Sequence, residues 1–461
     1  MKDFTLAEIA KACNGEYVGD ESLKNTKITS VERDSRQVKN GSLFLAIKGE
    51  RVDGHDFIEK CFAQGAVCAL CEKAPENATK PCIVVPSTLD AVKKIGRAYR
   101  EKFDIPVIGI SGSVGKTSTK EMLYAVLSQK FKTHKTQGNL NNELGVPLTL
   151  LSMPEDTEAA VIEMGISDFG EMTRLSEMVQ PTICVLTIIG ECHLENLGDR
   201  DGVLKAKTEM FKNACENADF ILNGDDDKLS TVKTVNGKKP VFFGLDAKND
   251  FYAKNIKNSG DGKVLATLCF DNNNIDVEIP AIGTYMVTNA LGAAFDPLTL
   301  FTDGTCSELK PGLTDEEIAN GVASYKTVGS RANVINTGKI KIIDDCYNAN
   351  PTSVRASLDT LSNLDGRKVA ILGDMKELGS EELKLHFDTG VYAKSKGIGT
   401  VITVGELAKE LAKGADGKAF DTIEDAKPEI LKTIKSGDVV LVKASHSMQF
   451  ENIVEFLKQN F

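Results

Sequence analysis

The stretch GISGSVGKTSTKEM, residues 109 to 122, places glycines, a lysine and a hydroxyl side chain directly after an apolar run. Glycines let successive backbone N–H groups point inward, and the positive end of a following helix adds to the attraction for phosphate. Lys116 is therefore expected to contact the outer phosphates of a nucleotide, and Thr117 a magnesium ion. Ile110 replaces the usual first glycine, so the loop has the shorter form GxxGK[ST]. It predicts a nucleoside triphosphate site rather than a plain glycine turn.

Two further polar residues follow apolar runs and extend this candidate site. Glu163 lies at the end of AAVIEM, and His193 lies just past TICVLTII. In an open parallel sheet the ligand crevice lies outside the carboxyl ends of the strands, so Lys116, Glu163 and His193 are expected to converge there. A carboxylate and an imidazole beside a phosphate loop could form a magnesium shell. Magnesium prefers oxygen ligands, however, so a structural role for His193 is the alternative.

These residues need buried strands to position them, and the apolar runs divide the chain into three units. Residues 1–100 contain short strand-like pieces and one helix-like stretch, which indicates a small α/β domain. Residues 101–329 alternate apolar runs with helical patterns, and residues 245–280 suggest a small antiparallel addition. Residues 330–461 contain four strand-like runs, which favours a Rossmann-like domain. The predicted fold is α/β in three domains, with a parallel-sheet P-loop ATPase domain in the centre.

Composition limits the classes of function. The formal net charge of −11 disfavours a grip on nucleic acid or on an anionic membrane, which both require an excess of lysine and arginine. No apolar run reaches bilayer length, and the opening MKDFTLAEIAKACNG lacks a signal-peptide core, so a cytoplasmic protein is expected. The eleven cysteines fit a reducing compartment. Cys68 and Cys71 form a CxxC, but its run AVCALCE predicts a buried strand rather than a metal site.

Several longer stretches resemble one known family, the Mur ligases of peptidoglycan synthesis. They are DSRQVKNGSLFLAIKGERVDGHDFI, TQGNLNNELGVPLTLL, VIEMGISDFGEM, CHLENLGDRDGVLKAKTEMF, IIDDCYNANPTSVRASLDTL and AILGDMKELG, which together cover nearly the whole chain. The DDxYNANPxS stretch is the most discriminating, because relatives that add the earlier residues carry different sequences there. It resembles the members that join D-alanyl-D-alanine to UDP-N-acetylmuramoyl-tripeptide.

The resemblance implies an ATP-dependent amide ligase that forms ADP and phosphate. The terminal carboxylate of the tripeptide would attack the γ-phosphate, and the amine of D-alanyl-D-alanine would then attack the resulting acyl phosphate. Positioning and charge neutralisation would contribute most of the catalysis. We expect a cytoplasmic monomer that uses ATP and Mg²⁺, with neither nucleic acid nor membrane as a partner. The N-terminal domain would bind the UDP-linked substrate.

The family's motifs assign roles to residues of this chain. The catalytic residues would be Lys116, Glu163, His193 and Lys207, and the metal ligands Thr117, Glu163, His193 and Lys207. The nucleotide would be bound by Gly112, Ser113, Val114, Gly115, Lys116, Thr117, Ser118, Asn289, Arg331 and Asp345. The substrates would be bound by Ser35, Arg36, Lys48, Asn139, Asn142, Asn348 and Asn350.

A lysine is an unusual metal ligand, and the resemblance implies that this one is a carbamate. An ammonium group repels a metal, whereas reaction with CO2 turns the side chain into an anionic oxygen ligand that suits magnesium. Lys207 matches the family spacing A-K-x-x-[IM]-F, and Lys205, two residues earlier, is the rival. The alternative is an ordinary solvated lysine on a helix.

Three places depart from the family's pattern. Tyr285 and Met286 stand where His-Asn usually precedes the adenine-side asparagine, and His446 replaces an arginine. Pro297, within the segment 295–312, is expected to interrupt a helix. Two alternative functions follow: a ligase of the same superfamily that adds another amino acid or glutamate, and a nucleotide-dependent switch. The third residue of the tripeptide, lysine or meso-diaminopimelate, depends on the shape of the pocket.

Overall fold

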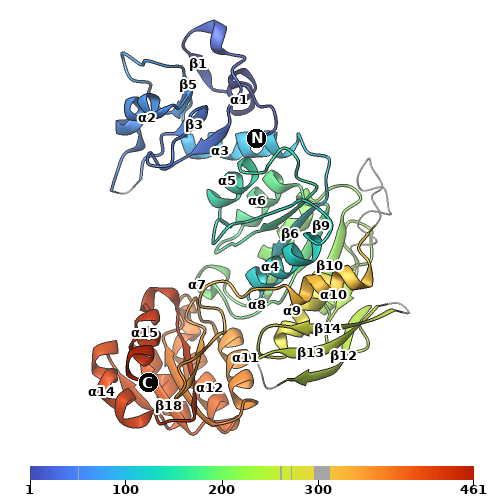
Figure 1. Ribbon diagram of the computed structural model, residues 1–461, viewed down its shortest axis with the longest axis vertical. Helices are drawn as coiled ribbons and strands as arrows, with labels where there is room; N and C mark the ends of the chain where they lie inside the picture. Colours follow the sequence, from blue (N-terminus) through green and yellow to red (C-terminus); the bar gives the residue numbers. More distant parts are fainter. Residues whose placement is uncertain (50, 260–261, 271–272, 295–311) are drawn as a thin grey trace.

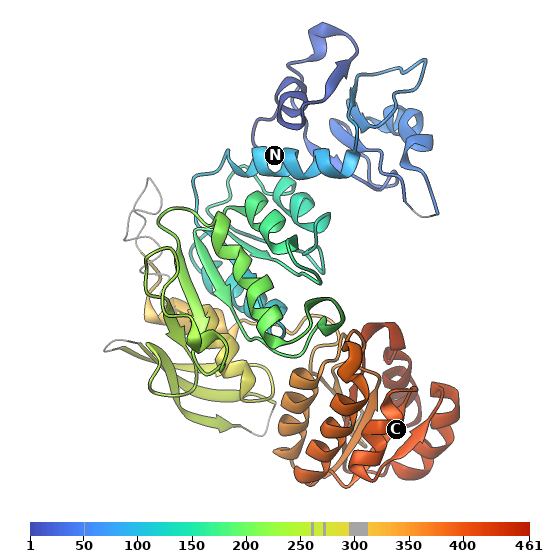
Figure 2. The ribbon, with the colours of Figure 1, turned by 180° about the vertical axis from the view of Figure 1, so that it is seen from behind.

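The chain folds into three α/β domains, each built on its own sheet, and they follow one another along an elongated molecule (Figures 1 and 2). The structure is a computed structural model and describes residues 1–49, 51–259, 262–270, 273–294 and 312–461. Within these ranges no helix is both long and apolar enough to cross a membrane. The predicted class, α/β in three domains, is confirmed.

The N-terminal domain contains a sheet of five strands in the order β1-β5-β4-β3-β2, in which only the β1–β5 pair is antiparallel. Both cysteines of the CxxC lie in β4 and are completely buried, so the predicted strand is confirmed. The strands are β1 (Glu16–Val18), β2 (Ser30–Glu32), β3 (Ser42–Leu45), β4 (Cys68–Cys71) and β5 (Cys82–Val84).

One long helix joins this domain to the next. The helices of the domain are α1 (Leu6–Cys13), α2 (Ile58–Gln64) and α3 (Thr88–Arg100). Helix α3 packs on α1 of its own domain and on two helices of the central domain, α5 (Gly145–Leu151) and α6 (Glu171–Val179). Tyr99 Oη donates to the backbone oxygen of Met153 at 2.9 Å, and Arg100 Nε donates to that of Val179 at 3.0 Å. The two domains therefore share one continuous apolar core.

The central domain contains a sheet of nine strands in the order β14-β13-β12-β11-β10-β9-β6-β8-β7. The strands from β7 to β12 run parallel, and β12, β13 and β14 form an antiparallel extension, as expected for residues 245–280. The strands are β6 (Val107–Ser111), β7 (Thr133–Lys135), β8 (Ala159–Glu163), β9 (Ile183–Leu186), β10 (Asp219–Asn223), β11 (Val241–Phe243), β12 (Phe251–Asn258), β13 (Val264–Phe270) and β14 (Asn273–Ile279).

Helices cover both faces of the central sheet, which explains why its strands are continuous apolar runs. One face packs against α4 (Lys116–Leu127), α9 (Tyr285–Ala294) and α10 (Asp315–Ala323). The other packs against α5, α6 and α8 (Arg200–Thr208), while α7 (Leu194–Leu197) precedes α8 at the edge facing the C-terminal domain (Figure 1). The described part of α9 runs to Ala294, and the expected helix break at Pro297 lies outside the described residues.

The C-terminal domain contains a sheet of six strands in the order β15-β16-β20-β17-β18-β19, parallel except for the edge pair β15–β16. The four predicted runs form β16, β17, β18 and β20, whereas the short edge strands β15 and β19 were not predicted. The strands are β15 (Asn333–Asn336), β16 (Lys341–Asp344), β17 (Arg367–Gly373), β18 (Thr400–Val404), β19 (Lys418–Phe420) and β20 (Asp438–Lys443). The helices are α11 (Pro351–Ser362), α12 (Glu382–Ser395), α13 (Ala408–Ala415), α14 (Ile423–Thr433) and α15 (Glu451–Asn460).

Candidate functional site

The glycine loop joins the end of β6 to the start of α4. Gly115 has a φ of +88°, a conformation that favours glycine, and a Cβ atom there would lie 2.8 Å from Asn289 Oδ1. Helix α4 begins at Lys116, so the unpaired N–H groups of its first turn lie at the loop. Lys116 Nζ donates to the backbone oxygen of Gly112 at 2.6 Å, and burial lowers the pKa of this lysine. The loop therefore has the geometry of an anion site.

A buried carboxylate faces this loop from the end of the neighbouring strand β8. Glu163 is only 2% exposed, and Thr117 Oγ1 lies 3.1 and 3.0 Å from its two carboxylate oxygens. Asn141 Nδ2 donates to Glu163 Oε1 at 2.8 Å, and Lys120 Nζ lies 3.5 Å from Oε2. The adjacent strands β6 and β8 thus bring a hydroxyl and a carboxylate together, which are oxygen donors of the kind that magnesium prefers.

The loop opens into a cavity of about 920 Å³. Its walls come from segments that follow β6, β8, β9 and β10 in the central domain, and from the segment that follows β16 in the C-terminal domain. Lys116, Glu163 and His193 all line it, so the side chains expected to converge do lie around one cavity. Other predicted residues that line it are Ser113, Val114, Gly115, Thr117, Ser118, Asn142, Asn289, Arg331, Asp345, Asn348 and Asn350.

His193 lies at the boundary between the central and C-terminal domains. It precedes α7 with a φ of +52°, and its Nδ1 lies 2.6 Å from Glu377 Oε2 of the C-terminal domain. The His193 ring beside it lowers the pKa of Glu377. Glu377 lies in the family stretch AILGDMKELG, but no role was predicted for it, so sequence reasoning missed this partner of His193.

The two rival lysines of α8 have different environments. Lys207 is 1% exposed, and burial lowers its pKa to about 8. Cys192 and Lys116 lie close enough to influence this pKa electrostatically. Lys205 is exposed, with Nζ 5.6 Å from the centre of the Phe169 ring. Lys207 is therefore the lysine of the pair that points into the protein near the phosphate loop.

Residues from α9 and the C-terminal domain form the rest of the cavity wall. Asn289 Oδ1 accepts from Thr119 Oγ1 at 3.3 Å, and Met286, in one of the departing positions, accepts from Asn289 Nδ2 through sulfur at 3.4 Å. Asp345 binds Lys443 Nζ at 2.6 Å and the backbone N–H of Ala332 at 3.1 Å, which places it beside Arg331.

In the neighbouring part of this wall, two other side chains lie against the ring of Tyr347. The guanidinium carbon of Arg331 lies 3.6 Å from the centre of the Tyr347 ring, and the His446 ring, at another departing position, lies 5.6 Å from it. Asn350 caps α11 through a hydrogen bond from the backbone N–H of Ser353 at 2.8 Å. Part of its hydrogen-bonding capacity is therefore used inside the protein.

Some predicted residues lie away from this cavity. Ser35, Arg36 and Lys48 belong to the N-terminal domain, where Arg36 forms an exposed ion pair with Asp34. Among the described residues, the cavity wall includes none of Gly112, Asn139 and the buried Lys207. A substrate that contacts both these N-terminal residues and the residues of the cavity wall would have to extend from the N-terminal domain to the phosphate loop.

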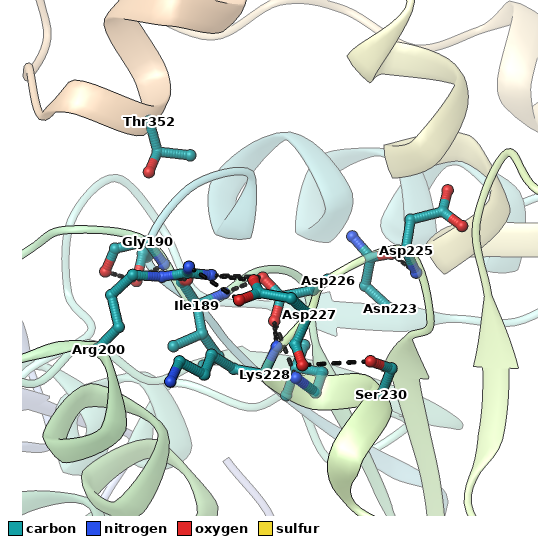
Figure 3. A network of polar contacts seen from close by, with 12 residues as sticks. Ile189, Gly190, Arg200, Asn223, Asp225, Asp226, Asp227, Lys228, Ser230 and Thr352 are labelled. Carbon is teal, nitrogen blue, oxygen red and sulfur yellow. Dashed lines mark hydrogen bonds and ion pairs between the residues drawn. The ribbon is translucent and has the colours of Figure 1, made fainter. Parts of the chain in front are cut away.

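A polar network that sequence reasoning missed holds the backbone just before His193 (Figure 3). The N–H of Ile189 donates to Asp226 Oδ2 at 2.9 Å, and its carbonyl oxygen accepts from Arg200 Nε at 2.8 Å. Asp226 is 5% exposed and also accepts from the N–H groups of Lys228 and Leu229. The sequence did contain a signal for Asp226, because an acidic run directly follows the buried strand β10.

Asp226→Ala is expected to lower the free energy of unfolding by about 2–4 kcal/mol, because two buried N–H groups and one partly buried N–H group lose their acceptor. Asp227→Ala is the matched control, since Asp227 is exposed and forms a surface ion pair with Arg200 worth at most about 1 kcal/mol. Urea unfolding followed by circular dichroism measures both variants. Equal loss of stability in the two would contradict the assigned role of Asp226.

Three family models match consecutive parts of the chain. The description "Mur ligase family, catalytic domain" matches residues 27–101, "Mur ligase middle domain" residues 110–295, and "Mur ligase, glutamate ligase domain" residues 330–446. Together they account for most of the chain and follow the order of the three sheets.

Individual relatives match the chain along its whole length. The UDP-N-acetylmuramoyl-tripeptide–D-alanyl-D-alanine ligase of Bacillus subtilis is 35% identical, with 98% of each chain covered, and the Escherichia coli protein of that name is 33% identical over 100% of this chain and 99% of its own. Among solved structures, MurF from Acinetobacter baumannii superposes with a TM-score of 0.88 at 31% identity, covering 100% of this chain and 99% of its own. MurF ligase from Thermotoga maritima in complex with ADP gives 0.81 at 29%, covering 94% and 97%. The chain belongs to the Mur ligase family.

Proposed function

We propose that this chain is an ATP-dependent ligase that joins D-alanyl-D-alanine to UDP-N-acetylmuramoyl-tripeptide in peptidoglycan synthesis, with release of ADP and phosphate. The observation that carries the proposal is its end-to-end similarity to ligases of that name. A phosphate loop that opens into a cavity between two domains supports it. Because ATP and a nucleotide-linked precursor are the substrates, the chain is proposed to act in the cytoplasm, as a monomer. The proposed domains are residues 1–100, 101–329 and 330–461.

The nucleotide is proposed to lie along residues 112–118 with its γ-phosphate near Lys116. A lysine held in a partly buried loop can neutralise the charge that spreads over the phosphoryl oxygens during transfer. Asn289, packed against Gly115, would bind on the adenine side. Arg331 and Asp345 would reach the nucleotide from the C-terminal domain, so both domains would take part in ATP binding.

Magnesium fits the donor set beside the loop. Thr117 Oγ1 and the carboxylate of Glu163 are oxygen donors in contact, and His193 is proposed as a further ligand. Among the described residues no group of three or more His, Cys, Asp or Glu side chains comes together. Coordination positions of the ion would therefore remain for phosphate oxygens and water, which is how magnesium is usually held in such sites. When bound, the ion would neutralise phosphate charge during transfer.

Lys207 is proposed to become a carbamate and so to supply an anionic oxygen to a second magnesium. Burial lowers the pKa of this amine to about 8, so far more of it is neutral at physiological pH than for an ordinary lysine. Only a neutral amine can attack CO2, with formation of an N–C bond and loss of a proton. The exposed Lys205 lacks this environment.

The reaction is proposed to proceed in two steps. The tripeptide carboxylate attacks the γ-phosphorus and ADP leaves, and the amine of D-alanyl-D-alanine then attacks the acyl carbon and phosphate leaves. Ser35, Arg36 and Lys48 would hold the uridine nucleotide at the distant end of the substrate. Side chains proposed to bind nearer the reacting groups are Asn139, Asn142, Asn348 and Asn350.

ADP release is expected to be slow with the tripeptide nucleotide alone and to rise sharply when D-alanyl-D-alanine is added, because an acyl phosphate is useful only when an amine intercepts it before water. One amide should form per ATP consumed, and mass spectrometry should find the nucleotide heavier by a whole dipeptide. Single D-alanine should be a poor acceptor, because the second residue and terminal carboxylate of the dipeptide provide binding energy that supports turnover. Both lysine and diaminopimelate tripeptides belong in the assay.

Two results would contradict this function. A product extended by a single amino acid or by glutamate would identify another ligase of the superfamily. Hydrolysis of ATP without a joined product, whichever acceptor is supplied, would indicate a nucleotide-dependent switch.

A further inference from the structure

The contact between His193 and Glu377 is part of a close fit across the domain boundary. Besides the 2.6 Å approach of Nδ1 to the carboxylate, the backbone N–H of Glu195 donates to the carbonyl oxygen of Glu377 at 3.3 Å. His193 and Glu377 have φ values of +52° and +65°, a left-handed conformation that residues with side chains adopt only when surrounding contacts hold them. The Glu377 loop is thus fitted to the start of α7.

The same segment of the central domain makes a second contact with the C-terminal domain. The Thr352 hydroxyl, at the start of α11, donates to the Glu191 carboxylate, and Arg355 lies 3.9 Å from it. Gly190 lies so close that a Cβ atom there would be 2.4 Å from Thr352 Oγ1. Thr352 lies directly above Gly190 in Figure 3. Two separate elements of the C-terminal domain therefore hold residues 190–195.

On its other side this segment is bonded to the phosphate loop. Ser113 Oγ accepts from the N–H of Gly190 at 2.9 Å and lies 3.2 Å from its carbonyl oxygen. Cys192 Sγ lies 3.0 Å from the same hydroxyl. Residues 190–195 therefore connect the loop that would hold the nucleotide phosphates with the domain that supplies Glu377.

The 2.6 Å approach of Nδ1 to a carboxylate oxygen favours a proton on Nδ1, because a lone pair there would repel the carboxylate. A neutral imidazole with its proton on Nδ1 keeps its lone pair on Nε2, and His193 lines the cavity that contains Thr117 and Glu163. Histidines that bind metals commonly donate their other ring N–H to a carboxylate, which fixes the tautomer and the orientation of the ring.

We propose that Glu377 is a positioning residue that the C-terminal domain supplies to the magnesium site: it holds His193 as the Nδ1–H tautomer, so that Nε2 can bind the metal. The metal site is then complete only when the C-terminal domain is docked as observed. This inference rests on the proposed function only in taking a magnesium–nucleotide complex as the ligand. Glu377 itself is 57% exposed, so its ion pair adds little to folding stability, and its removal should affect metal binding instead.

Binding of Mn²⁺, a spectroscopic substitute for Mg²⁺, to the full chain in the presence of ADP tests the proposal by electron paramagnetic resonance. Glu377→Ala is expected to weaken Mn²⁺ binding about tenfold, the scale found when a partner of a metal ligand is lost. Glu377→Gln keeps an oxygen acceptor for Nδ1–H and should remain within about threefold of the unmodified chain. Glu381→Ala is the matched control, because it removes an equally exposed acid that pairs with Lys384 on the protein surface.

Nitrogen-15 NMR of the histidine rings provides a readout that a merely structural role would not change. The His193 signals should indicate one tautomer in the unmodified chain and a mixture in Glu377→Ala. In a His193→Ala background, Glu377→Ala should have no further effect on Mn²⁺ binding.

Three results would overturn the inference. The first is unchanged Mn²⁺ binding in Glu377→Ala, and the second is tighter Mn²⁺ binding in that variant, which would mean that Glu377 competes with the metal for the ring. The third is an equal effect of Glu377→Ala on Mn²⁺ binding in the His193→Ala background. The product assay tests the proposed ligase function separately from the inference about Glu377. Metal binding that depends on Glu377, in a chain that forms no dipeptide adduct, would support the inference and contradict the ligase activity.

Discussion

Lys116→Ala is expected to lower ligase turnover by about a hundredfold or more, the loss found when a preorganised electrostatic donor is removed. The ammonium group lies at the start of α4 beside the glycine loop, where the γ-phosphate would be transferred. Its charge should matter most in the transition state, so kcat should fall at saturating ATP. Steady-state ADP release with both substrates present measures the effect.

The fold of this variant should remain intact. Burial lowers the pKa of Lys116, which means that holding the charged form there costs stability, so the unfolding temperature should not fall. Lys132→Ala is the matched control, because Lys132 is an exposed lysine paired with Asp156, just before β7 at the opposite end of the sheet. Near-normal turnover by Lys116→Ala would show that the loop does not hold the transferred phosphate.

Lys207→Ala is expected to be nearly inactive, with a loss larger than the roughly 10- to 100-fold found for partners of metal ligands, because the carbamate would be a ligand itself. Short carboxylic acids that enter the vacated space should restore part of the activity, since they supply the same anionic oxygens. Turnover with and without acetate or propionate measures this.

Lys205→Ala provides the control, because it removes a lysine two residues away that is exposed over Phe169. It should retain near-normal turnover and show no response to the acids. Full activity of Lys207→Ala, or rescue confined to Lys205→Ala, would assign the role elsewhere. Electrospray mass spectrometry under native conditions with bicarbonate provides a second test, through an added CO2 that is absent from Lys207→Ala.

The local features of this protein could be predicted from its sequence because they depend on short-range physics. The phosphate loop needs glycine at Gly115, where φ is positive, and a helix that starts at Lys116, and both are encoded within a few residues. Buried strands such as β8 and β9 are continuous apolar runs because helices cover both faces of the sheet. The convergence of Lys116, Glu163 and His193 followed from a general rule about the carboxyl ends of parallel strands.

Contacts between residues far apart in the chain were decided only by the tertiary structure. Asp226 holds Ile189, and Glu377 meets His193, because two domains and several loops meet at one edge of the central sheet. No periodicity or spacing encodes these pairs, since each side chain alone is an ordinary polar residue of a loop. Only the resemblance to the family spacing favoured Lys207 over Lys205 in the sequence, whereas the packing of α8 buries Lys207 and exposes Lys205. The sequence by itself therefore determined the chemistry of the loop and the class of fold, whereas the docking of the domains decided which groups orient and complete the site.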